Sequence, residues 1–142
     1  MATDQRHSVS VAGVVVDDQG RALIIQRRDN GHWEPPGGVL EHGETIEDGL
    51  RREVYEETGL KIEPGPITGV YQNMRHHIIA LVFRCRAVGG QLTENNEAAA
   101  FRWATWDEIP ELMTQAYATR ILDGLADSNA PAVRTHDGVS LL

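Results

Sequence analysis

The chain contains little cysteine and no long apolar run, and both shortages restrict what it can be. Cys85 is the single cysteine among 142 residues. An internal disulfide is therefore excluded, and a reducing cytoplasm is the expected setting. No run of about 18 apolar residues occurs, so no membrane-spanning helix is expected. Residues 1–8 are polar and lack the apolar core of a signal peptide.

Basic residues are also scarce. The net charge is −8, and Lys61 is the only lysine among the 13 basic residues. A protein that holds long nucleic acid by its phosphates needs a basic face, so this class of partner is excluded. An acidic protein that acts on an anionic small molecule needs a local positive charge, which a bound cation can supply.

The pattern along the chain predicts one domain over residues 1–142, with an α/β core at about 8–126. Strands are expected at 8–16, 22–26, 62–71, 78–88 and 98–104, and helices at 45–58, 107–113 and 114–126. The turn residues Asp17 to Gly20 predict that the first two strands form a hairpin. The segment 127–142 shows no clear period and is expected to be a loosely ordered tail.

The expected helix at 45–58 carries a stripe of glutamates. Thr45 is suited to cap its start and Gly59 to end it. Residues three and four apart share a helix face, so Glu53, Glu56 and Glu57 lie within about a third of the circumference. An apolar stripe beside them is expected to pack on the sheet: Ile46, Leu50 and Val54.

Three carboxylates that are close together and partly desolvated repel one another, which raises their pKa values. They must either take up protons or bind a cation. Mg²⁺ prefers hard oxygen ligands and is commonly shared between protein carboxylates and substrate phosphates. No cysteine or histidine cluster lies nearby, which argues against zinc. The alternative is that Glu56 and Glu57 belong to an ordinary charged helix surface.

The spacing around this stripe forms a longer motif. It runs Gly, five residues, Glu, seven residues, Arg-Glu, an aliphatic, any residue, Glu-Glu, any residue, Gly and an aliphatic. The residues at these positions are Gly38, Glu44, Arg52, Glu53, Val54, Glu56, Glu57, Gly59 and Leu60. Every fixed position is met. The segment resembles the Nudix box, and the resemblance extends over about residues 8–126, in the manner of MutT-like proteins.

This resemblance implies an α/β/α sandwich with a mixed central sheet, and the hydrolysis of a pyrophosphate bond with Mg²⁺, or Mn²⁺ as a substitute. It implies metal ligands at Glu53, Glu56 and Glu57 and at the Gly37 carbonyl. Arg52 and Glu44 are expected to form an ion pair that orients the helix. An arginine beside such a stripe also offsets the repulsion between its carboxylates.

Glu97 is predicted to reach the same site from outside the motif, as a metal ligand or as the base that takes a proton from the attacking water. Many Nudix enzymes resemble this arrangement, with a glutamate just before a strand that bears a tryptophan, here Trp103. A carboxylate that is not occupied by metal is also the better base. Glu94 is the competing candidate, and a merely solvated loop glutamate is the plainer alternative.

Substrate contacts are assigned to Arg27, Arg28 and Gly38, although a solvated strand end explains the two arginines equally well. A nucleobase needs only an aromatic plane on which to stack. Five aromatic residues are candidates for it, each of which could instead be core: Trp33, Tyr71, Phe83, Trp103 and Trp106.

The expected substrate is a small nucleoside diphosphate derivative, with a nucleoside triphosphate favoured. The proline that ADP-ribose pyrophosphatases tend to have about fifteen residues beyond the motif is missing, and Arg75 lies in that neighbourhood. A nucleotide-sugar or ADP-ribose pyrophosphatase is the alternative. A nucleotide sensor without catalysis is disfavoured, because such proteins usually lose a motif glutamate. A homodimer is compatible with the sequence.

Overall fold

The computed structural model describes residues 5–142, so part of the polar segment 1–8 lies outside the described residues. Its elements in chain order are β1 (Ser8–Val15), β2 (Ala22–Arg27), β3 (Trp33–Glu34), β4 (Gly37–Val39), α1 (Ile46–Thr58), β5 (Leu60–Asn73), β6 (Ile78–Gly90), β7 (Ala98–Ala104), α2 (Ile109–Leu112), α3 (Gln115–Leu125) and β8 (Ala132–His136). In this range no helix is long and apolar enough to cross a membrane.

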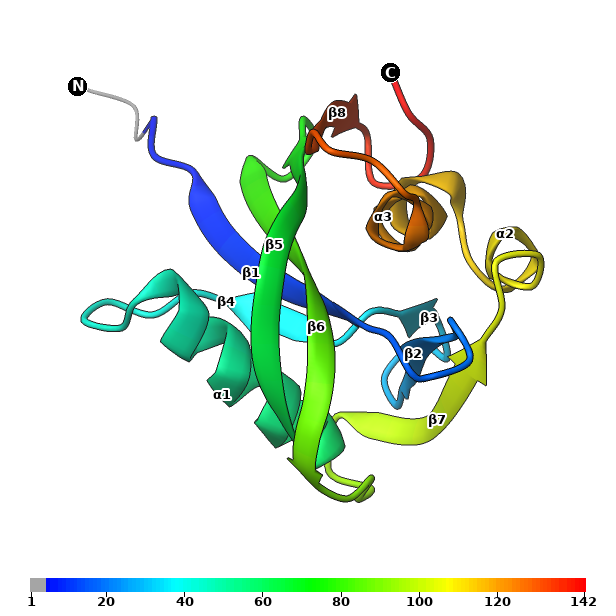
Figure 1. Ribbon diagram of the computed structural model, residues 1–142. Helices are drawn as coiled ribbons and strands as arrows, with labels where there is room; N and C mark the ends of the chain where they lie inside the picture. Colours follow the sequence, from blue (N-terminus) through cyan, green and yellow to red (C-terminus); the bar gives the residue numbers. More distant parts are fainter. Residues whose placement is uncertain (1–4) are drawn as a thin grey trace.

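The described strands form two sheets between helical layers. The larger sheet has the order β4-β1-β6-β5-β8 and the smaller has the order β3-β2-β7. The larger sheet is mixed, because β1 is parallel to β6 and antiparallel to β4. Helix α1 covers one side, and α2 and α3 lie on the other (Figure 1). The predicted α/β/α sandwich with a mixed sheet is confirmed.

Two apolar clusters fill the spaces between these layers. Successive side chains of β1 point to opposite faces of the sheet, so β1 contributes to both clusters. Val11 and Val15 pack with Leu50 and Val54 of α1. Ala12 and Val14 pack on the opposite face, with residues of β2, β5 and α3. A strand whose successive side chains are buried on both faces must lie inside the molecule.

The predicted hairpin between β1 and β2 is wrong. The turn itself forms, since the Gly20 N–H donates to the Asp17 carbonyl over 3.1 Å. Beyond the single bridge Val16–Ala22, however, the two strands belong to different sheets. The physical reason is that β4 and β6 already occupy both edges of β1, so β2 pairs with β3 and β7.

Helix α1 confirms the predicted helix and its caps. The Thr45 hydroxyl accepts from the Asp48 N–H over 3.1 Å. Gly59 ends the helix with φ 82°, a left-handed conformation that suits glycine. One residue of the apolar stripe is corrected, because Ile46 is 40% exposed. It lies in the first turn, and the buried face runs instead through Leu50, Val54 and Glu57.

The C-terminal segment 127–142 also differs from its expectation as a loosely ordered tail. Strand β8 pairs in parallel with β5, from Gly69–Ala132 to Asn73–His136. The Arg134 guanidinium forms two hydrogen bonds with the Asp123 carboxylate of α3, at 2.7 and 2.8 Å. The partner strand β5 is far away in the sequence, which is why the local pattern gave no signal for β8.

Candidate active site

Arg52 is the centre of the charge network on α1. Its Nε and Nη2 form a bidentate salt bridge with the Glu44 carboxylate, at 2.9 and 2.7 Å. Its Nη1 lies 3.0 Å from Glu53 and 3.2 Å from Glu56. The hydrogen bonds from Arg52, together with the Glu41 N–H, lower the pKa of Glu44 to about 2. The predicted Arg52–Glu44 pair is therefore present, and it ties the loop before α1 to the helix.

Glu57 lies deeper than the other carboxylates of the stripe and is only 5% exposed. Burial raises its pKa to about 8, and the negative charge of Glu53 adds to the shift. Glu34 and Glu97 also raise it, so both carboxylates lie within electrostatic reach. Burial raises the pKa of Glu53 as well, although Arg52 opposes this effect.

The glycines of β4 leave the space that these carboxylates occupy. A Cβ atom at Gly38 would overlap the Glu53 carboxylate. A Cβ atom at Gly37 would overlap the Val11 carbonyl, because β4 lies tightly against β1. Glycine is therefore required at position 37 by the close approach of backbone, and glycine at position 38 leaves the space that the Glu53 carboxylate occupies. The backbone N–H of Gly37 also donates to the Glu57 carboxylate.

The loop before β7 is fixed against the end of α1. The Asn95 amide donates to the Glu57 carbonyl over 2.6 Å, and its oxygen accepts from the Glu97 N–H over 2.9 Å. The Arg28 guanidinium donates to the Asn95 carbonyl over 2.7 Å. Glu97 acts electrostatically on Glu53 and Glu57. Glu94 instead lies 3.8 Å from Arg28 on the exposed surface.

The donor set fits a hard divalent cation. Within the described chain the Glu57 carboxylate has no ion-pair partner, although it is buried among other carboxylates. A cation there would relieve the repulsion that raises its pKa. As the side chains stand, no three acidic, histidine or cysteine residues among 5–142 enclose a metal-sized space, since Glu53 and Glu56 are turned toward Arg52.

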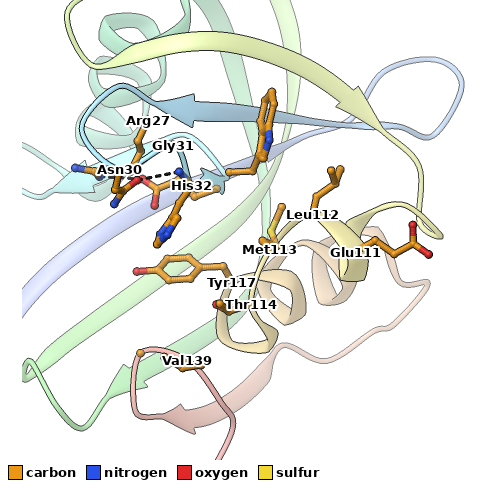
Figure 2. Close-up of a pocket in the computed structure, with 13 residues that line it drawn as sticks. Arg27, Asn30, Gly31, His32, Glu111, Leu112, Met113, Thr114, Tyr117 and Val139 are labelled. Carbon is orange, nitrogen blue, oxygen red and sulfur yellow. Dashed lines mark hydrogen bonds and ion pairs between the residues drawn. The ribbon is translucent and has the colours of Figure 1, made fainter.

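A pocket of about 600 Å³ lies within electrostatic reach of this cluster, and its volume is in the usual range for small-molecule sites. Glu34 lines the pocket and also raises the pKa of Glu57, so it joins the two regions. Three separate segments form the walls (Figure 2). They are residues 27 and 30–34, residues 111–114 with Tyr117, and residues 138–139.

The predicted substrate residues differ in their placement. Arg27 lines the pocket, but its guanidinium is already held by Asp29 at 2.7 Å and by Glu34 at 3.1 Å. Arg28 does not line it and holds the Asn95 loop instead. Gly38 faces the Glu53 carboxylate. Neither arginine is thus a free cation on the pocket wall.

The candidate aromatic residues divide in the same way. Trp33 lines the pocket, whereas Tyr71 is fully buried and its hydroxyl donates to Asp123 over 2.6 Å. Phe83 and Trp103 pack against the core on the α1 side. Trp106 is largely exposed and lies outside the pocket.

The family model of the NUDIX domain matches residues 6–123. The chain belongs to the Nudix family. Its MutT-like relative from Streptomyces ambofaciens is 54% identical over 136 residues, covering 96% of this chain and 88% of that protein. The ADP-ribose pyrophosphatase of Methanocaldococcus jannaschii is 34% identical, covering 74% of this chain and 66% of that protein. The predicted membership, and with it a Nudix hydrolase, is confirmed.

Further relatives agree with this assignment. The human 8-oxo-dGDP phosphatase NUDT18 is 37% identical over 116 residues, and the match covers 79% of this chain but only 36% of that protein. The crystal structure of an ADP-ribose pyrophosphatase from Streptococcus suis aligns with a TM-score of 0.75 at 22% identity, covering 92% of this chain and all of that one. At this identity the structural match supports the fold alone.

Three parts of this Nudix site were missed from the sequence. Glu34 was given no role from the sequence, although an acidic residue between Trp33 and Pro35 was a usable signal. Tyr117 was taken only as part of the predicted helix 114–126. Gly138 and Val139 fell in the segment expected to be loosely ordered, and nothing in the local sequence relates them to a pocket.

Proposed function

We propose that this Nudix hydrolase cleaves a pyrophosphate bond in a nucleoside diphosphate derivative with Mg²⁺, and that a nucleoside triphosphate is the favoured substrate. The observation that carries the proposal is Glu57, a buried carboxylate among carboxylates with no ion-pair partner in residues 5–142. Such a group beside a pocket is typical of a catalytic site. The names of the relatives, ADP-ribose pyrophosphatase and 8-oxo-dGDP phosphatase, fit a nucleotide substrate.

Mg²⁺, or Mn²⁺ in its place, would be held by the side chains of Glu53, Glu56, Glu57 and Glu97 and by the Gly37 carbonyl. When bound there, the cation would neutralise charge on the diphosphate and activate water for attack on phosphorus. The Glu56 side chain is largely exposed and accepts a hydrogen bond from Arg52. It therefore has to turn away from Arg52 to serve as a metal ligand.

The protein's own residues would position the substrate and accept the proton. Arg52 holds Glu53 and Glu44 and so fixes the carboxylates against the glycine pair. Glu97, on the loop held by Asn95, would serve as ligand or base. The pocket beside Glu34 would take the nucleoside, with Trp33 as an aromatic wall. Arg27 and Arg28 would act mainly by holding this pocket and the Glu97 loop.

A nucleotide sugar or ADP-ribose is the second candidate substrate. The pocket volume of about 600 Å³ supports this alternative, because a space of that size can hold a group larger than a nucleobase. The sensor alternative has no such support, since all motif glutamates are kept. We also expect a cytoplasmic protein, given its lone buried Cys85, and a homodimer remains an expectation.

A substrate panel with Mg²⁺ tests the proposed reaction. Release of inorganic phosphate, pyrophosphate and nucleoside monophosphate should be measured for nucleoside triphosphates, 8-oxo nucleotides, ADP-ribose, nucleotide sugars and nucleoside monophosphates. We expect cleavage between phosphates and little action on monoesters. A strong preference for monoesters would overturn the proposal.

The role of Glu97 is tested by parallel Glu97→Gln and Glu94→Gln variants. Turnover at saturating Mg²⁺ and the Mg²⁺ concentration for half activity are both measured. Loss of turnover alone in Glu97→Gln identifies a base, and a raised Mg²⁺ requirement identifies a ligand. Glu94→Gln should behave like the unmodified chain, because Glu94 pairs only with Arg28 on the surface. If both readings are unchanged in Glu97→Gln, Glu97 is removed from the site, and Glu53 or Glu57 is left as the proton acceptor.

A further inference from the structure

The C-terminal segment 132–142 lies beyond residue 123, where the family model ends, and yet it supplies one wall of the pocket. Strand β8 adds to the edge of the larger sheet beside β5. The chain then turns back, so that Gly138 and Val139 line the pocket next to Thr114 and Tyr117 (Figure 2).

This wall is fixed by hydrogen bonds to the start of α3. The Ala116 N–H donates to the Val139 carbonyl over 3.0 Å, and the Leu141 N–H donates to the Gln115 side chain over 2.9 Å. The turn is closed on itself, because the Asp137 carboxylate accepts from the Val139 and Ser140 N–H groups at 2.9 and 2.8 Å. The position of Val139 is therefore set by the fold.

A buried histidine connects the same turn to the helix wall. His136 is fully buried, and the Gly138 N–H lies 2.9 Å from its Nδ1. Its Nε2 lies 3.1 Å from the Arg120 Nη2. Burial and the charge of Arg120 lower the pKa of His136. The Arg120 guanidinium stacks on Tyr117, a residue of the pocket wall, with 4.8 Å to the ring centre.

Val139 has the properties of a contact residue for a ligand. It is 55% exposed, and its backbone is held while its apolar side chain borders the pocket. The other apolar lining residues are Trp33 from one segment and Leu112 and Met113 from another. An apolar wall with a few fixed polar groups suits a flat heterocycle.

We propose that the turn 137–141 is a specificity loop and that Val139 contacts the nucleobase of the substrate, away from the reacting phosphates. This inference rests on the proposed function, because it takes the pocket as the nucleoside site. The loop discriminates between substrates through binding and leaves the chemical step to the carboxylate cluster.

The matched pair Val139→Glu and Val133→Glu tests it. Val133 lies in the same segment, is 80% exposed and is outside the pocket. On the nucleotide that the unmodified chain cleaves fastest, Val139→Glu should raise KM about tenfold, the scale of an apolar contact in a specificity pocket, with little change in kcat. Its inhibition constant for the nucleoside monophosphate should rise likewise, and that for inorganic pyrophosphate should not. Val133→Glu should match the unmodified chain in KM and in both inhibition constants.

The outcomes separate the inference from the proposed function. Equal KM values for the two variants on a well-cleaved nucleotide would overturn the loop's role and leave the reaction intact. If no nucleotide is cleaved, the proposed function fails, and calorimetric binding of nucleoside monophosphates decides the loop's role instead. Weaker binding by Val139→Glu alone would then support the loop, and equal binding by both variants would overturn it. Urea unfolding midpoints confirm that both variants fold.

Discussion

Two arginines show how differently this molecule uses the same side chain. Arg52, with a quarter of its side chain exposed, contacts the carboxylates of Glu44, Glu53 and Glu56. Arg120 is 8% exposed and contacts no carboxylate in the described chain. It lies between two tyrosine rings, and its Nε is buried without a hydrogen-bond partner. One arginine holds an acidic cluster together, and the other links a helix to the C-terminal segment.

The comparison teaches that the two sides of this fold balance buried charge in different ways. The α1 side concentrates carboxylates at a partly solvent-exposed edge, where an arginine and a bound cation can balance their negative charge. The α3 side buries one cation among aromatic groups, where polarisable faces replace a counter-charge. Substitutions in the first region should therefore affect chemistry and pH dependence, and those in the second should affect substrate fit.

The largest expected effect is on turnover. Glu57→Gln should lower kcat with Mg²⁺ on the order of a hundredfold or more, the scale of losing an electrostatic or acid–base group. The helix content measured by circular dichroism should not change. Glu47→Gln on the exposed first turn of the same helix is the control and should keep full activity. Near-normal kcat in Glu57→Gln would place the essential charge elsewhere.

The pH dependence of stability without metal should be the next largest effect. The folded chain keeps a proton on Glu57 up to a pKa of about 8, whereas the unfolded chain loses it near the ordinary glutamate pKa of 4.5. Between these values the folded state binds more protons, so stability falls as pH rises. The free energy of unfolding in urea with EDTA should fall by about 2 kcal/mol from about pH 5.5 to about pH 7.5.

Glu57→Gln sharpens this test, because the variant cannot titrate at that position. Its stability should fall much less over the same pH interval. Added Mg²⁺ should restore the stability of the unmodified chain at the upper pH by occupying the carboxylates. A slope that is the same in both proteins would assign the titration to another group.

The two arginines themselves can be compared by substitution with methionine. Arg52→Met leaves Glu44, Glu53 and Glu56 without their partner and should clearly lower the urea midpoint. Arg120→Met removes a buried cation that has no carboxylate to leave behind, so its free energy of unfolding should change by less than about 1 kcal/mol. If Arg120→Met loses as much stability as Arg52→Met or more, the contacts of Arg120 with the two tyrosines and His136 contribute more than burial of its charge costs.

The smallest predicted effect concerns the glycine pair. Gly38→Ala brings a methyl group into the space of the Glu53 carboxylate and should lower kcat about tenfold, because small displacements of positioned groups reduce catalysis. Gly89→Ala is the matched control, since its Cβ would meet Lys61 at ordinary contact distance. Full activity in Gly38→Ala would mean that Glu53 has room to move without consequence.

The sequence by itself determined the parts whose physics is local. The caps of α1, its glutamate stripe and the Arg52–Glu44 spacing follow from 3.6 residues per turn and from side-chain chemistry within a few residues. The Nudix assignment rests on that same segment and was confirmed by the family model. The site roles of Glu53, Glu56 and Glu97 stay predictions, although the structure brings Glu53 and Glu97 within electrostatic reach of Glu57.

Only the tertiary structure decided which distant segments meet. Pairing of β1 with β4 and β6 excluded the expected hairpin, and pairing of β8 with β5 ordered the tail. Glu34 comes within electrostatic reach of Glu57 through sheet packing, and Val139 comes to line the same pocket as Tyr117 through the turn that follows β8. Strand neighbours are chosen by long-range hydrogen bonding and burial, and no local period carries that information.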